Sequence, residues 1–216
     1  MSSNTLSKTG NLSRVLVATD GSDESAGAIR TGIALSMAHG ARLIGLSIAL
    51  DNPEYSTFVP NLQEMAEQHA RDALNSFTAE AGEGAETVIR EATDSAHGIA
   101  EAAAELGADI IVMGQHNKGG LARMLVGATT AGVIGHATCP VLVAPRAAHL
   151  WEKHVLLATD GSAHSQAATE VAGRIARQAR LPITVVSVVT SSHSDERRKE
   201  AERAVAAAVE RLKELG

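Results

Sequence analysis

Short apolar runs alternate along most of the chain with longer segments that carry apolar residues at helical spacing. The first run is RVLVAT at 14–19, and a short apolar run bounded by turn residues is typical of a strand buried on both faces. The next segment starts near Ser22, a good helix N-cap, and stops at Gly40, a residue that often ends helices. Strands that alternate with helices pair in parallel through right-handed crossovers. The pattern therefore predicts an α/β fold.

The same pattern sets approximate bounds for the predicted elements. We expect strands at 14–19, 42–50, 86–91, 108–114 and 140–144, and helices at 22–39, 61–81, 95–106 and 128–137. Beyond residue 153 the pattern supplies a strand at 154–159, a helix at 164–179, a strand at 183–190 and a last helix. Apolar residues at a 4-3-4-3 spacing give that last helix one apolar stripe: Ala201, Val205, Ala208, Leu212 and Leu215.

The chain contains an internal repeat with an offset of 140 residues. RVLVATDGSDES at 14–25 returns as HVLLATDGSAHS at 154–165, with eight of twelve positions identical. The same offset places LIGLSIAL at 43–50 over ITVVSVVT at 183–190 without a gap. Nothing in the second copy corresponds to residues 86–144, so we expect it to be a half-domain.

These patterns predict a disordered leader at 1–13, a complete domain at 14–145, a linker at 146–153 and a partial second copy at 154–216. In the partial copy the first strand lacks a neighbour on one edge, and an open apolar edge favours pairing or aggregation. Two explanations stay open. Either the chain is a shortened form of a longer tandem protein, which we favour, or the partial copy packs on another surface, for example in a dimer. In the first case we expect self-association.

Composition and charge argue against several classes of function. A formal net charge of −6, without a cluster of Lys and Arg, argues against nucleic-acid binding. No apolar run approaches the roughly 18 residues of a membrane span, and the polar start is unlike a signal peptide. Cys139 is the only cysteine, so no internal disulfide forms. We expect Cys139 to be a small core residue of a cytoplasmic protein.

Catalytic and metal chemistry find little support in the sequence. The nine histidines show no metal-ligand spacing, and HLWEKH at 149–154 lies in the expected linker. No serine lies in a G-x-S-x-G turn, which argues against a hydrolase nucleophile. We therefore assign no catalytic residue and no metal ligand.

Asp20 follows the first predicted strand, at the carboxyl end of a parallel sheet, where open α/β folds bind ligands. Its carboxylate can accept hydrogen bonds from a ribose or an adenine amine. The alternative is that Asp20 and Ser22 only shape the turn and cap the helix.

The glycine-rich stretch after Gly114 leads into a helix that begins near Gly127. Backbone N–H groups of such a loop and of a helix N-terminus form an anion site, to which Lys118 and Arg123 can add charge. The alternative is that the glycines only allow a tight loop, with both cations in solvent.

Taken together, VLVATDGS, ADIIVMGQHNKGGLARMLVGATTAGVI and CPVLVAP resemble the universal stress protein family. The resemblance covers residues 14–145 in full and 154–215 in part, as in tandem members of the family. It implies an open parallel five-stranded sheet of order 3-2-1-4-5, of the Rossmann-like, adenine-nucleotide α-hydrolase-like type. It also implies a role in stress response or regulation more than a reaction.

Nucleotide-binding members carry Gly, two residues, Gly, nine residues, and then Gly followed by Ser or Thr. This chain keeps the spacing with Gly114, Asn117, Gly127 and Ala128, but two of the four positions are changed. Asn117 can adopt a left-handed conformation, so the turn can survive. Ala128 has no hydroxyl to donate to a phosphate, a loss of roughly 1 kcal/mol or more. Thr129 and Thr130 are candidates to compensate.

By resemblance, the candidate nucleotide-binding residues are Ala18, Thr19, Asp20, Ile48, Met113, Gly114, Gln115, His116, Asn117, Lys118, Gly127, Ala128 and Thr129. Asp160 and Val188 repeat Asp20 and Ile48 in the partial copy, which has no glycine loop to hold a triphosphate.

The resulting hypothesis is a cytoplasmic regulator that binds ATP, with or without Mg²⁺, and acts through dimerisation and an unknown protein partner. The first alternative is an interaction protein of the same fold that binds no nucleotide. The second is a slow ATPase, although the sequence identifies no general base.

Overall fold

The computed structural model describes residues 12–51, 59, 61–115, 127–149 and 153–216. The chain divides into two compact units, residues 1–150 and 151–216. The strands of the first unit are β1 (Arg14–Ala18), β2 (Arg42–Leu50), β3 (Glu86–Ala92), β4 (Ile110–Gly114) and β5 (Val141–Ala144). Its helices are the 3₁₀ turn η1 (Asp23–Ser25), α1 (Ala26–His39), α3 (Leu62–Ala81), α4 (Ser95–Glu105) and α5 (Ala128–His136).

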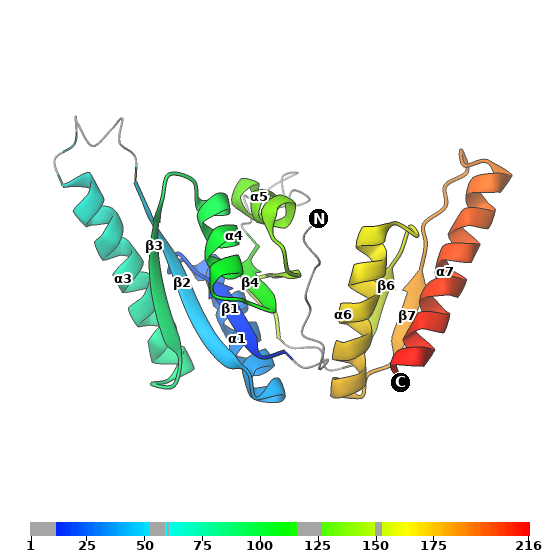
Figure 1. Ribbon diagram of the computed structural model, residues 1–216, viewed down its shortest axis with the longest axis horizontal. Helices are drawn as coiled ribbons and strands as arrows, with labels where there is room; N and C mark the ends of the chain where they lie inside the picture. Colours follow the sequence, from blue (N-terminus) through cyan, green and yellow to red (C-terminus); the bar gives the residue numbers. More distant parts are fainter. Residues whose placement is uncertain (1–11, 52–58, 60, 116–126, 150–152) are drawn as a thin grey trace. The chain divides into compact units, whose positions relative to one another are not determined.

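The five strands of the first unit form one parallel sheet in the order β3-β2-β1-β4-β5 (Figure 1). The predicted strand order 3-2-1-4-5 is thus confirmed. β1 lies at the centre, where Val15, Leu16 and Val17 are fully buried. This burial explains why the strand is a continuous apolar run rather than an alternating one.

Two layers of helices cover the sheet. α1 and α3 pack together, and a Cβ added to Gly45 of β2 would lie 2.5 Å from the Phe77 ring of α3. Only a glycine at position 45 lets the Phe77 ring of α3 lie this close to the backbone of β2. α4 and α5 pack together over a cluster that includes Leu16, Leu46 and Ile99. This packing places the amino ends of α4 and α5 above the carboxyl ends of the strands, as parallel crossover connections require.

The sequence misplaces the start of the first helix. Ser22 precedes the turn η1, α1 begins at Ala26, and the Ser22 side chain makes no capping hydrogen bond. The buried Ser25 explains the extra turn, because its hydroxyl donates to the Ser22 carbonyl over 2.7 Å and lies 2.9 Å from the Thr19 hydroxyl. These side-chain bonds stabilise a tighter turn before the helix.

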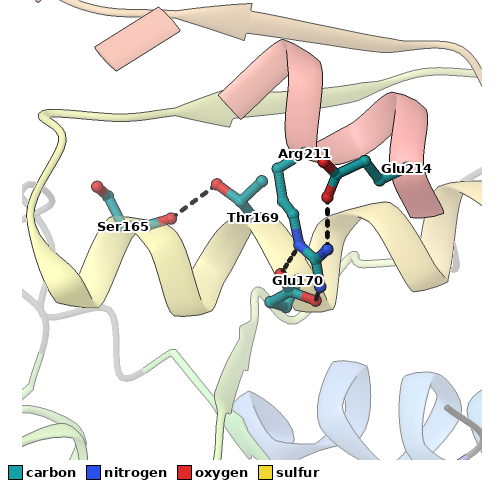
Figure 2. Close-up of polar contacts among 5 residues, drawn as sticks. All are labelled: Ser165, Thr169, Glu170, Arg211 and Glu214. Atoms are coloured by element: carbon teal, nitrogen blue, oxygen red, sulfur yellow. Dashed lines mark hydrogen bonds and ion pairs between the residues drawn. The ribbon is translucent and has the colours of Figure 1, made fainter. Parts of the chain in front are cut away.

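The second unit contains β6 (Val155–Ala158), α6 (Ala163–Ala179), β7 (Ile183–Val186) and α7 (Asp195–Leu215). β6 and β7 form a two-stranded parallel sheet, and α6 packs against α7. Ala208 of α7 is buried, and the other four residues of its predicted stripe are half-buried. Arg211 of α7 also pairs with Glu170 of α6 and, over 2.7 Å, with Glu214 (Figure 2).

β7 is shorter than the predicted strand 183–190. In the first unit β1 pairs with residues 42–46 of β2, whereas β3 pairs with residues 44–50 and is the partner of the last four residues of the strand. In the second unit β7 pairs with β6 alone, over 183–186. The described part of this unit holds no counterpart of β3, so residues 187–190 lack the partner that extends β2.

Candidate functional site

A cavity of about 640 Å³ opens at the carboxyl ends of β1, β2 and β4. Small-ligand sites typically enclose about 300–1,000 Å³ and occur at this edge of open α/β sheets. Its described lining comprises Ala18, Thr19, Asp20, Ser22, Glu24, Ser25, Leu46, Ser47, Ile48, Leu50, His69, Ser95, Ile99, Met113, Gly114, Gly127, Ala128, Thr129 and Thr130.

The turn after β1 supplies the polar side of the cavity. Oδ1 of Asp20 accepts hydrogen bonds from the backbone N–H of Ser22 over 3.0 Å and from its hydroxyl over 2.6 Å. The hydroxyl of Thr19 accepts the N–H of Gly21 over 3.1 Å. These bonds tie the carboxylate to the turn, so the turn presents a held anion rather than a mobile side chain.

Apolar side chains from the sheet and α4 form a second side of the cavity. Leu46 and Met113 are buried in the core, whereas Leu50 at the end of β2 is 47% exposed. Ile48 and Ile99 complete this surface. A flat apolar group such as a nucleobase is the kind of ligand that such a surface favours, since burial of apolar area stabilises the complex.

The amino end of α5 forms the third side. Gly127 is the N-cap of this helix, and the first N–H groups of a helix have no partner within it. Thr130 is only 3% exposed and lines the cavity. Thr129 is exposed. The two threonines therefore differ as candidates to replace the hydroxyl missing at Ala128, and Thr130 is the better placed.

Gly114 has a packing role that is independent of any ligand. A Cβ at this position would lie 2.6 Å from the carbonyl oxygen of Glu24 in η1. Such a contact is shorter than real Cβ contacts, so a larger residue would push the turn after β1 away from β4. This glycine therefore keeps two sides of the cavity together.

The structure brings nine of the thirteen sequence candidates to this cavity: Ala18, Thr19, Asp20, Ile48, Met113, Gly114, Gly127, Ala128 and Thr129. Gln115 follows β4 but does not line the cavity, and its N–H donates to the Ala144 carbonyl over 3.1 Å. His116, Asn117 and Lys118 lie outside the described residues, as does Arg123. Ligand binding by any of these residues stays a prediction.

Sequence reasoning missed several lining residues, chiefly Ser95 and His69 as polar groups, and it named Thr130 only as a candidate to compensate for Ala128. Ser95 follows Asp94, the N-cap of α4, so a helix-start signal could have placed it at this edge. His69 lies inside α3, and no local motif marks it. Among the described lining residues the acidic side chains are Asp20 and Glu24, and none is Lys or Arg.

Other sequence candidates lie outside the cavity. Cys139 is half-buried against the sheet core, and burial, followed by the charge of Asp109, raises the pKa of its thiol to about 11. It is therefore protonated at neutral pH and a poor nucleophile. In the described ranges no group of three or more His, Cys, Asp or Glu is arranged to hold a metal ion. None of the described helices is long and apolar enough to cross a membrane.

Comparison with known proteins identifies the family. The sequence profile of the universal stress protein family matches residues 11–145 and 152–216. The chain belongs to this family. Universal stress protein MJ0531 of Methanocaldococcus jannaschii is 29% identical over 136 residues, which are 60% of this chain and 80% of that protein.

Solved structures of universal stress proteins share the fold. UspA of Lactobacillus plantarum is 25% identical with a TM-score of 0.52, over 62% of this chain and 98% of its own. A universal stress protein of Archaeoglobus fulgidus is 14% identical with a TM-score of 0.65, over 92% of this chain and 74% of its own. The first match is confined to about the length of one complete domain, whereas the second extends over most of this universal stress protein.

Proposed function

We propose that this universal stress protein binds an adenine nucleotide, with ATP as the leading candidate, and acts as a stress-response regulator. The base and ribose would lie between Asp20 and the apolar residues Ile48 and Met113, and the phosphates at the amino end of α5. Nucleotide occupancy would then alter the surface that the protein presents to a partner.

The position of Thr130 at the amino end of α5 is the observation that carries this proposal. Thr130 is 3% exposed and lines the cavity, so its hydroxyl is a candidate donor to a ligand there. It lies beside the first backbone N–H groups of α5, which have no partners within the helix. Donors from a side chain and a helix N-terminus at one place suit a phosphate, and they offset the loss of a hydroxyl at Ala128.

Isothermal titration with ATP, in the presence and absence of Mg²⁺, tests the proposal directly. We expect saturable heat and a raised melting temperature. The absence of both at millimolar ATP would contradict nucleotide binding. The same samples, assayed for released phosphate, test the alternative of slow ATP hydrolysis.

The alternative of an interaction protein has its own supporting observation in the second unit. Leu156 of β6 is 68% exposed and Val188 is 76% exposed, whereas Leu16, the counterpart of Leu156, is fully buried beneath α4. In the described part of this unit no helix covers that face of the sheet. We propose that the protein self-associates through this apolar face, because its burial would be favourable.

The proposed compartment is the cytoplasm, where a reduced thiol such as Cys139 is ordinary.

A further inference from the structure

Two histidine rings from different helices lie in contact on the surface of the first unit. His97 is in the first turns of α4, and His136 is the last residue of α5. Their ring centroids are 4.2 Å apart, and the planes are inclined by 44°. Both side chains are exposed, so a solute reaches them without any opening of the fold.

A hydrogen bond between the His136 ring and a backbone carbonyl of α5 determines which ring nitrogen keeps a free lone pair. Nδ1 of His136 lies 2.8 Å from the carbonyl oxygen of Gly132. A carbonyl oxygen can only accept, so Nδ1 carries the proton and donates. In the neutral ring Nε2 then has no proton and presents a lone pair.

Asp94 orients the second ring in a similar way. Oδ1 of Asp94 accepts the backbone N–H of His97 over 2.8 Å and lies 3.6 Å from Nδ1 of the same residue. The nearby carboxylate favours the proton on Nδ1 and leaves the Nε2 lone pair of His97 available. A histidine whose Nδ1–H faces a carboxylate or carbonyl oxygen is the usual arrangement of a metal-ligating imidazole.

We propose that His97 and His136 bind one divalent transition-metal ion of the Zn²⁺, Ni²⁺ or Cu²⁺ class through their Nε2 atoms. Imidazole nitrogens prefer these ions to Mg²⁺ or Ca²⁺, which prefer oxygen ligands. Zn–N bonds are about 2.0–2.1 Å long, so nitrogens on one ion lie at most about 4 Å apart. Rings with centroids 4.2 Å apart can meet this limit by small side-chain rotations. Water completes the coordination, and Asp94 is a positioning residue.

Metal binding at this site would join α4 to α5. Ile99 of α4 and Thr130 of α5 line the cavity, whereas His97 and His136 do not. The ion would therefore fix the relative position of two helices that border the cavity. The site does not depend on nucleotide binding, since neither histidine lines the cavity.

Titration of the full chain with ZnCl₂ and NiCl₂, without nucleotide, tests the proposal. We expect one ion per chain at saturation and a raised melting temperature. His97→Gln and His136→Gln should each weaken binding on the order of tenfold or more, and Asp94→Asn should weaken it less. His164→Gln removes an exposed histidine of α6 and is the matched control, with unchanged binding. Unchanged binding in both pair variants, or no binding by the wild type, would overturn the proposal.

A second measurement serves if a variant fails to fold. Diethyl pyrocarbonate modifies exposed imidazoles at their free nitrogens, and peptide mass spectrometry reports each histidine. We expect Zn²⁺ to protect His97 and His136 of the wild type together and to leave His164 reactive. Modification of both members of the pair at the same rate with and without Zn²⁺ would contradict the site.

Discussion

The hydroxyl of Ser22 donates a hydrogen bond to Oδ1 of Asp20 over 2.6 Å. The equivalent serine of the second copy also caps a helix. Its hydroxyl accepts the N–H of Ser165 over 3.2 Å and so caps α6, while the backbone N–H of Ser162 donates to Asp160 over 2.9 Å. Both serines thus stabilise the aspartate of their turn, but only Ser162 also caps the following helix.

This difference predicts unequal effects of two matched substitutions. Ser162→Ala removes a helix cap and should destabilise the second unit by about 1 kcal/mol. Ser22→Ala removes no cap and should destabilise the first unit by less. Urea unfolding followed by hydrogen exchange at the amides of α1 and α6 measures both losses. Equal protection of α6 before and after Ser162→Ala would contradict the capping role.

Asp160 predicts a specific pH dependence. The hydroxyl and the backbone N–H of Ser162, with the Ser165 hydroxyl, stabilise the carboxylate and lower its pKa to about 2. Because the folded pKa lies below the ordinary value of about 3.9, this group stabilises the fold above that value. Its contribution is lost as the pH falls from about 4 to about 2. Carbon-detected NMR titration of the Asp160 carboxyl should show this low pKa, and Ser162→Ala should raise it. Ser192→Ala, in an exposed turn, should leave it unchanged.

Thr130 and Ala128 predict opposite changes in ATP affinity. Thr130→Val keeps the side-chain shape but removes the hydroxyl, so we expect ATP affinity to fall about tenfold, as a hydrogen bond to a charged group is worth about 1.5–3 kcal/mol. Ala128→Ser should raise the affinity by restoring a donor.

Thr31→Val is the matched control for this pair, measured by the same calorimetry. The Thr31 hydroxyl is buried without a hydrogen-bond partner among the described residues, but it lies in α1 and does not line the cavity. Its loss should leave ATP affinity unchanged. If Thr130→Val binds ATP as tightly as Thr31→Val does, the Thr130 hydroxyl has no part in phosphate binding.

The exposed face of the second unit predicts self-association. Light scattering should give a mass above that of the monomer for the wild type, and Leu156→Lys with Val188→Lys should reduce it to the monomer because charges oppose apolar contact. Met37→Lys replaces another exposed apolar residue, 79% exposed in α1, and should leave the mass unchanged. A monodisperse wild-type monomer would refute the proposed association.

Much of the fold could be predicted because its signals are local. β1 is buried on both faces, so its residues form an unbroken apolar run, and Gly40 ends α1 in the left-handed conformation that glycine favours. The predicted bounds failed where side-chain bonds or strand partners decide them. Ser25 delays the start of α1, and the end of β7 depends on a neighbouring strand.

Only part of the candidate site could be found in the same way. Asp20 and Gly127 follow from their positions beside strand and helix ends. Thr130 could not be distinguished from Thr129 from the sequence, because helix phase selects a direction only once α5 is docked. His69 carries no local signal at all, since it reaches the cavity from the middle of α3.

The sequence by itself determined the α/β class, the repeat with its offset of 140 residues, the family and the turn that holds Asp20. These features follow from periodicity and from neighbours along the chain, which residue types encode directly. Only the tertiary structure decided that Thr130 is buried at the cavity, that His97 meets His136 and that Leu156 is exposed while Leu16 is covered. Each of these depends on which distant element packs against the residue, and that choice belongs to the assembled sheet and its helices.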